Sequence, residues 1–161
     1  MNAEKVQFLK ERFILLLKQI PSDTPPQWGK MALQQMIEHF ADSVRVASGK
    51  TLYSDVLTPE IHLEKMRNFI MNDKPFRENT VNPLVPVVPA PVKNPSVEEA
   101  IGDLQKELHY FFSWFEEHPF QVTRNPLFGD LNYEENLHLL YKHALHHLKQ
   151  FGITIPSETQ A

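Results

Sequence analysis

Apolar residues recur at intervals of three and four positions over several stretches of the chain. In the first stretch they are Val6, Leu9, Phe13, Leu16 and Ile20. Residues with this spacing lie on one face of an α-helix, and a proline that follows them ends the helix. Pro21 occupies that place. The pattern therefore predicts a first amphipathic helix that ends before residue 21, followed by a loop over residues 22–26.

A second long helix is predicted over residues 28–48, with Gly49 as its C-cap residue. Its apolar face is formed by Met36, Ile37, Phe40, Val44 and Ala47. Pro59 then opens a shorter and less regular segment, and we expect a peripheral helix over residues 60–72. The sequence thus predicts one long and one short helix between the first loop and the proline-rich connection.

Two more long helices are predicted in the second half of the chain. Ser96 and Glu99 have the spacing of a capping box, which marks the start of a helix. The apolar seam of that helix is formed by Ile101, Leu104, Leu108, Phe111 and Phe115, and the helix should close near His118. Asn132 is a second N-cap, followed by an acidic first turn. The last helix should run to about residue 151, with Gly152 as its C-cap residue.

Proline is concentrated in the connection from Pro75 to Pro95. The prolines there are Pro75, Pro83, Pro86, Pro89, Pro91 and Pro95. Proline disrupts a helix interior and cannot donate a hydrogen bond in a central strand. We predict an extended crossover connection packed on the domain through the apolar residues between the prolines, namely Val81, Leu84, Val85, Val87 and Val88. A disordered linker between two domains is the alternative.

Four long amphipathic helices, one long connection and one short extra helix predict an all-α protein of the four-helix-bundle type. The sequence has neither internal repeats nor the alternating pattern of a strand. A chain of 161 residues is expected to form a single domain over residues 1–161. The first helix also carries apolar residues off its main stripe, at Ile14, Leu15 and Leu17. This surplus apolar surface suggests a homodimer, and the alternative is that neighbouring helices and the Pro75 to Pro95 connection cover it.

Composition narrows the range of functions. Hydrophobic residues at 42% and charged residues at 22% are ordinary for a soluble globular protein. The formal net charge of -4 argues against a general nucleic-acid binder. The absence of cysteine excludes a disulfide framework, a thiolate metal site and a cysteine nucleophile. The apolar run over residues 13–17 is too short for a signal peptide or a membrane span, so a cytoplasmic protein without membrane contacts is expected.

Histidines in two of the predicted helices suggest a metal site. His143 and His147 are four residues apart, so they lie on the same helix face, and His39 on the second long helix could complete a site across the bundle. Imidazole suits zinc, nickel, copper and iron, and a catalytic zinc site usually has three protein ligands and one open position. That position could hold an activated water or a substrate thiolate or carbonyl.

The spacing alone leaves the second ligand of the last helix open. His146 lies three residues after His143 and could pair with it, whereas His147 continues the seam from Leu140 through His143 and is favoured for that reason. The other histidines are interpreted as surface or satisfied core residues, namely His62, His109, His118 and His138.

Three polar residues are placed to orient the ligands. Ligating histidines usually donate their second ring N–H to a neighbouring group. Gln35 lies one turn before His39, Asp42 three residues after it, and Gln150 three residues after His147. No His-Glu-x-x-His, Gly-x-Ser-x-Gly, P-loop or dinucleotide motif accompanies them.

Two blocks of sequence resemble a known superfamily. Trp28-Gly-Lys-Met31, Gln35-Met36 and His39 resemble the start of the DinB-like (YfiT-like) metal-binding helix bundles. The tail resembles one uncharacterised branch of that superfamily, in the segments Asn125-Pro-Leu-Phe-Gly129-Asp-Leu131 and His143-Ala-Leu-His146-His147-Leu-Lys-Gln150-Phe-Gly152. The blocks lie on the second and fourth long helices and between them span most of the domain.

The resemblance implies a four-helix bundle with a long crossover and a divalent metal ion, commonly zinc or nickel. It implies that His39, His143 and His147 are the ligands and that His146 is not. The superfamily includes thiol-dependent transferases and isomerases, and many of its members are described as metal-dependent hydrolases. This chain has Leu148-Lys149 where the wider superfamily often has Arg-Gly, and its connection is unusually rich in proline. Substrate identity therefore does not carry over.

Two functions follow as expectations. The first is a metal-dependent hydrolase or a transferase that acts on a small-molecule substrate with a low-molecular-weight thiol. The alternative is a non-enzymatic metal-binding or structural bundle that serves in binding or in stress response. A catalytic site keeps an open coordination position, whereas a structural site is closed by a fourth protein ligand.

Overall fold

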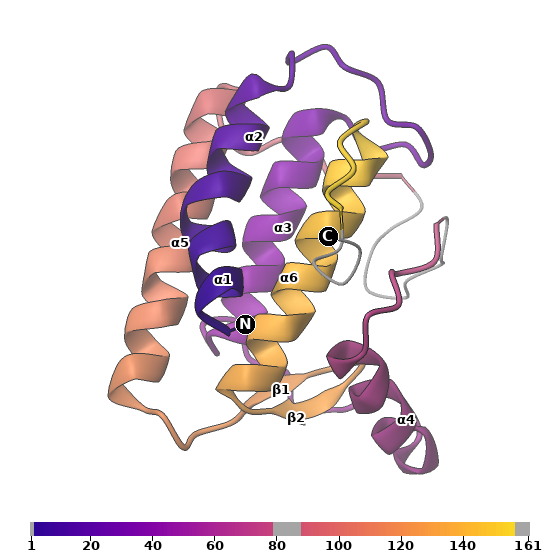
Figure 1. Ribbon diagram of the computed structural model, residues 1–161, viewed down its shortest axis with the longest axis vertical. Coiled ribbons are helices and arrows are strands. Elements are labelled where there is room, and N and C mark those ends of the chain that lie inside the picture. The colour runs from indigo at the N-terminus through magenta and orange to yellow at the C-terminus, as the bar shows by residue number, and fades with distance from the viewer. Residues whose placement is uncertain (1, 79–87, 157–161) are drawn as a thin grey trace.

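The computed structural model describes residues 2–78 and 88–156, and this part of the chain is mostly helical (Figure 1). Its elements in chain order are α1 (Asn2–Gln7), the π-helical turn η1 (Phe8–Arg12), α2 (Phe13–Gln19), α3 (Leu33–Ala47), α4 (Glu60–Met71), α5 (Val97–Glu117), β1 (Thr123–Asn125), β2 (Gly129–Leu131) and α6 (Tyr133–Gln150). No helix in the described ranges combines the length and the apolarity that crossing a membrane would require.

The long helices lie side by side around one apolar core (Figure 1). α1, η1 and α2 follow one another without a break, and together they form one helical rod that packs beside α3, α5 and α6. The largest fully buried side chains of this core include Phe13, Phe40, Phe111, Leu33 and Leu104. α4 lies apart from this group, beside the end of α6 where the strands are found (Figure 1).

The π-helical turn η1 changes which face of the first helix is buried. A π turn adds a residue to the turn and so rotates the side chains that follow it. Ile14 and Leu17 are consequently 2% and 0% exposed, while Leu15 is 57% exposed. The single chain therefore already covers two of the three residues from which a dimer was predicted. The homodimer stays a prediction, and among these three residues Leu15 alone now supports it.

α3 begins at Leu33, so the predicted start near residue 28 is wrong. Gly29 has a φ of 77°, a left-handed conformation that an α-helix does not accommodate. The side-chain Oε1 of Gln35 accepts a hydrogen bond of 2.8 Å from the backbone N–H of Ala32 and so defines the first turn of the helix. At the other end α3 stops at Ala47 with Ser48 as its C-cap residue, one residue before the predicted C-cap Gly49, which follows with a φ of 80°.

The strands β1 and β2 form a small antiparallel hairpin that the all-α expectation lacks. The side-chain Oδ1 of Asn125 accepts hydrogen bonds from the backbone N–H groups of Leu127 and Phe128, which closes the turn between the strands. The hydroxyl of Thr123 donates to the carbonyl of Ala47 at 2.8 Å and fastens the hairpin to the end of α3. Strands of three residues are too short to show alternation, so pattern analysis could not find them.

α4 is docked on the hairpin end of α6 by a second, smaller core. Its buried residues are Ile70, Phe128, Leu131 and Leu139, with Met66, Phe76 and Leu127 packed against them. The predicted peripheral helix is thus confirmed, with its last residue at Met71. The observed α5 and α6 agree equally well with their predicted starts, since Ser96 and Asn132 are their N-cap residues.

The connection from Pro75 to Pro95 is described at its two ends, and its predicted contacts at Val81, Leu84, Val85 and Val87 fall outside the described residues. Its last part is tied to α3. The carboxylate of Glu38 accepts hydrogen bonds from the backbone N–H groups of Lys93 and Asn94 at 2.7 and 2.9 Å. Val88 is 72% exposed. Polar hydrogen bonds therefore hold this part of the connection against α3.

Candidate metal centre

Three histidines from two helices converge beside the main core. His39 lies on α3, and His143 and His147 lie one turn apart on α6; one ring nitrogen of each lies within 4.8 Å of the other two. The centroid of the His39 ring is 5.2 Å from those of both His143 and His147. The expectation that these three residues come together is confirmed. Among the described residues, the group contains no fourth histidine, aspartate or glutamate.

The two histidines of α6 already touch through their Nε2 atoms, which are 2.7 Å apart. Such a distance is a hydrogen bond, so one of the two nitrogens carries a proton in this arrangement. Zinc–nitrogen bonds of about 2.0–2.1 Å at tetrahedral angles would separate ligand nitrogens by about 3.3 Å. Metal binding would therefore displace that proton and move the two rings slightly apart. The donor set itself, three imidazoles, suits zinc or nickel.

The core on either side of α6 fixes these rings in place. His143 stacks on the buried ring of Phe40 with their centroids 4.9 Å apart and an interplanar angle of 29°. His147 is 4% exposed, and its neighbours Ala144 and Leu148 are fully buried in the main core. Because the positions at i and i+4 share a helix face, the packing that buries one turn of α6 also orients the histidines on it.

Gln150 determines which nitrogen of His147 is free to bind a metal. One end of its amide lies 3.0 Å from the carbonyl oxygen of Trp28 and must be the NH2 group, since a carbonyl can only accept. The other end is therefore the oxygen, and it accepts a hydrogen bond of 2.8 Å from Nδ1 of His147. Nδ1 thus holds the proton, and Nε2 presents its lone pair to the cluster. Gln150 thus contacts His147, and its role in orienting a metal ligand stays a prediction.

The loop at residues 27–29 supports Gln150 from the other side. The backbone N–H of Gln27 donates to the carbonyl of Gln150 at 2.8 Å. A Cβ atom on Gly29 would lie 3.2 Å from Nε2 of Gln150, so only glycine allows this approach without displacement. Trp28 and Gly29 therefore lie against the end of α6 and not in a helix.

Burial keeps the histidines of the cluster neutral. It lowers the pKa of His143 and of His147 well below the ordinary value of 6.5, and the neighbouring histidines lower both further. The pKa of His39 is also lowered by burial, against the opposing effect of Asp42. Neutral imidazole is the form that binds metal, so the cluster is ready for a metal ion at neutral pH.

The remaining predicted residues have other partners. Gln35 Nε2 donates to the carbonyl of Ala90 at 2.9 Å while its Oε1 caps α3, so both ends of the amide are occupied away from the histidines. Asp42 pairs with Arg45 at 2.6 Å and reaches His39 only through its charge. The expected ligand-orienting hydrogen bonds of Gln35 and Asp42 are therefore not among those that the structure describes.

His146 lies beside the cluster, outside the group of three that could share an ion. Its ring is 5.3 Å from that of Trp28, 5.8 Å from that of Phe76 and 5.1 Å from that of His147, centroid to centroid. Burial lowers the pKa of His146, and the nearby Glu78 carboxylate opposes this effect. The choice of His147 over His146 from the seam of the last helix agrees with this geometry.

Sequence reasoning missed two residues next to the cluster. Phe76 contacts His143 with ring centroids 6.1 Å apart, and Lys142 is buried beside it on α6. Phe76 lies in the proline-rich connection, where no periodic pattern marks an inward-facing residue. Lys142 is a charged residue in the middle of a helix, a position at which exposure is the usual expectation.

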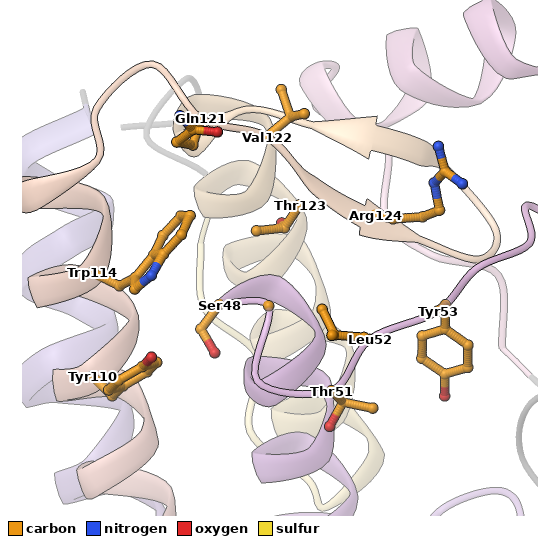
Figure 2. A pocket seen from close by; sticks show the side chains of 11 residues that line it. Ser48, Thr51, Leu52, Tyr53, Tyr110, Trp114, Gln121, Val122, Thr123 and Arg124 are labelled. Carbon is orange, nitrogen blue, oxygen red and sulfur yellow. The ribbon is translucent and has the colours of Figure 1, made fainter.

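Two hollows in the described surface lie away from the three histidines. The groove in Figure 2 has a volume of about 260 Å³ and lies between Tyr110 and Trp114 of α5 and the segment around Leu52. A polar hollow of about 400 Å³ lies beside Arg45 and Asp103. None of His39, His143 and His147 lines either hollow.

Comparison with known proteins finds no matching family model, no matching curated protein and no matching solved structure. The fold and the cluster define a mostly helical protein with three histidines that could hold a metal ion.

Proposed function

We propose that the protein is a metal-dependent enzyme with a four-helix bundle of the DinB-like type, in which His39, His143 and His147 bind one divalent ion, zinc or nickel. The observation that supports this proposal is the convergence of three ring nitrogens within 4.8 Å from two helices far apart in sequence. Surface histidines have no physical reason to meet in this way, and three imidazoles this close would repel one another once protonated, whereas their neutral forms can share one metal ion.

The chain contributes a preorganised set of neutral ligands. Burial disfavours protonation of His143 and His147, and Gln150 holds Nδ1 of His147 so that its Nε2 faces the cluster. When bound, the ion would supply Lewis acidity toward a water or a low-molecular-weight thiol. Since all three ligands are neutral, the protein would leave the charge of the ion uncompensated. The reaction proposed is hydrolysis or transfer of a small thiol.

Elemental analysis tests the metal site. The purified protein should contain close to one equivalent of zinc or nickel. Replacing His39, His143 or His147 by Ala should each remove most of it, whereas His146→Ala and the surface variant His109→Ala should keep it. Wild-type protein that cannot be loaded with either metal, or equal losses in the His146→Ala and His147→Ala variants, would contradict the assignment.

The number of ligands separates an enzyme from a structural metal protein. A group of three protein ligands leaves an open position, whereas a structural site is closed. We expect the Co²⁺-loaded protein to change its visible spectrum when a small thiol is added, and the zinc or nickel form to be active in a screen of thiol transfers and hydrolyses. A spectrum that ignores every added ligand would favour the alternative, a structural or stress-response bundle.

A further inference from the structure

α6 carries a stripe of basic residues beside the face that holds His143 and His147. Lys142, His146 and Lys149 have spacings of four and three, so they lie on one face of the helix, rotated by one residue from His143 and His147. All three residues of the stripe contact the end of α4 or the segment that follows it, residues 72–78. We call residues 72–78 the flanking segment.

Lys142 makes the strongest of these contacts. Its side chain is buried, and its Nζ donates to the side-chain Oδ1 of Asn72 at 2.9 Å and to the carbonyl of Lys74 at 2.6 Å. It also donates to the carbonyl of Phe69, in the last turn of α4, and lies 3.9 Å from the centre of the Phe69 ring. A cation at the C-terminal end of a helix is favoured by the helix dipole. Lys142 thus anchors both the end of α4 and the flanking segment.

The other two residues of the stripe hold the flanking segment farther along. The ring of His146 packs edge-on against that of Phe76, with centroids 5.8 Å apart. Lys149 forms an ion pair of 3.1 Å with Glu78, but both side chains are about half exposed, so the pair adds little. These contacts hold the flanking segment against α6. Lys142 makes the strongest of them and Lys149 the weakest.

These anchors place the ring of Phe76 against the cluster. Its centroid lies 6.1 Å from that of the proposed ligand His143, with the rings at 86°, and 5.8 Å from that of His146. The ring of Phe69 lies 5.6 Å from that of Phe76, centroid to centroid. Phe76 is half-buried, so its ring contacts the histidines while part of the residue stays accessible to solvent.

We infer that Phe76 controls which molecules reach the metal ion and that Lys142 is the positioning residue that holds it there. This inference rests on the proposed binding of a metal by His39, His143 and His147. It assigns to Phe76 the selection of ligands at that site: an apolar group of a substrate packs against the ring, whereas a small hydrated anion enters only when the flanking segment moves away.

The test uses Co²⁺ as the metal and azide as the incoming ligand, with binding followed by the visible spectrum in a stopped-flow instrument. Phe76→Ala removes the ring and keeps every polar anchor, and Lys142→Met keeps the length of the side chain and removes its hydrogen bonds. In both variants the azide association rate should rise about tenfold. This factor corresponds to a decrease of about 1.4 kcal/mol in the free energy needed to move the flanking segment away from the cluster. The affinity for Co²⁺ should stay within a factor of two or so of wild type, since no ligand changes.

Matched controls and a double variant complete the design. Phe120→Ala and Lys106→Met, at exposed positions of the loop after α5 and of α5, should leave the azide rate unchanged. The double variant should be no faster than Phe76→Ala, because both changes act through one ring. Unchanged rates in Phe76→Ala and Lys142→Met with Co²⁺ bound would overturn the inference alone. Failure of the wild type to bind Co²⁺ would overturn the proposed function and, with it, this inference.

Discussion

At the scale of single residues, the site depends on which atom of each side chain faces the cluster. The spacing of His143 and His147 predicted their shared face, and the seam of the last helix favoured His147 over His146. Proton positions could not be predicted, because they depend on Gln150 and on the carbonyl of Trp28, which lies far away in sequence. Gln35 shows the opposite case: it has the right spacing from His39, but its amide caps a helix whose start was predicted five residues too early.

Gln150 provides the sharpest test at this scale. Gln150→Leu removes the acceptor from Nδ1 of His147 and should weaken metal affinity by about 10- to 100-fold, the usual effect of losing such a partner. Gln150→Glu keeps an acceptor oxygen for Nδ1 of His147 but loses the donor to the carbonyl of Trp28, so it should weaken the affinity less than Gln150→Leu does. The exposed Gln105→Leu serves as the control for a change of the same kind on a helix surface. Titrations with a metal-sensitive dye measure the metal affinity of all three variants. Equal affinity in Gln150→Leu and wild type would show that Gln150 does not support metal binding.

At the scale of elements, local signals predicted helices well and their packing less well. Ser96 and Asn132 begin α5 and α6 as expected, because N-capping depends on residues that are adjacent in sequence. The π-helical turn at η1 has no comparable signal, yet it decides that Ile14 and Leu17 are buried. The ends of the proline-rich connection are likewise held by contacts between distant residues, with Glu38 as the main acceptor near α3.

Glu38 leads to a prediction about acid stability. Burial alone would raise the pKa of this carboxyl, but hydrogen bonds from Asn94, Lys93 and Gln34 together lower it below its ordinary value of 4.5. A carboxyl whose pKa is lowered by folding stabilises the protein above its unfolded-state pKa and loses that effect as the pH falls through the folded-state pKa. The Glu38→Gln variant should therefore be less stable than wild type by about 1–3 kcal/mol at pH 7.

The difference between the two proteins should begin to shrink below about pH 4.5, where Glu38 of the unfolded chain becomes protonated, and should be lost as the pH falls through the lower folded-state pKa. Urea unfolding between pH 3 and 7 measures this difference in stability. Metal-free proteins are used so that a bound ion does not affect the result. A difference that stays constant down to pH 3 would mean that the charge of Glu38 does not contribute to holding Lys93 and Asn94.

At the scale of the whole molecule, folding and metal binding should be coupled. The cluster joins α3 to α6, and the stripe of Lys142, His146 and Lys149 joins α6 to the end of α4. The sequence predicted the first connection because two histidines one helical turn apart and a third on another helix have the spacing of metal ligands. It could not predict the second, since Lys142 contacts backbone carbonyls, which leave no trace in sequence.

This coupling predicts how stability depends on pH and metal. Folding lowers the pKa of His143 and His147, so the unfolded chain binds more protons than the folded one between their folded-state values and about 6.5. The metal-free protein should therefore become more stable as the pH rises toward 6.5, and above that pH these residues should change its stability little.

Zn²⁺ at about 100 times its dissociation constant should add about 2.7 kcal/mol to the stability at neutral pH. That addition should vanish at low pH, where protons displace the metal from the imidazoles. Thermal unfolding from pH 4.5 to 8, with Zn²⁺ and with a chelator, measures both effects, and His147→Ala should lose the stabilisation by Zn²⁺. Equal stabilisation of wild type and His147→Ala by Zn²⁺ would place the ion elsewhere on the protein.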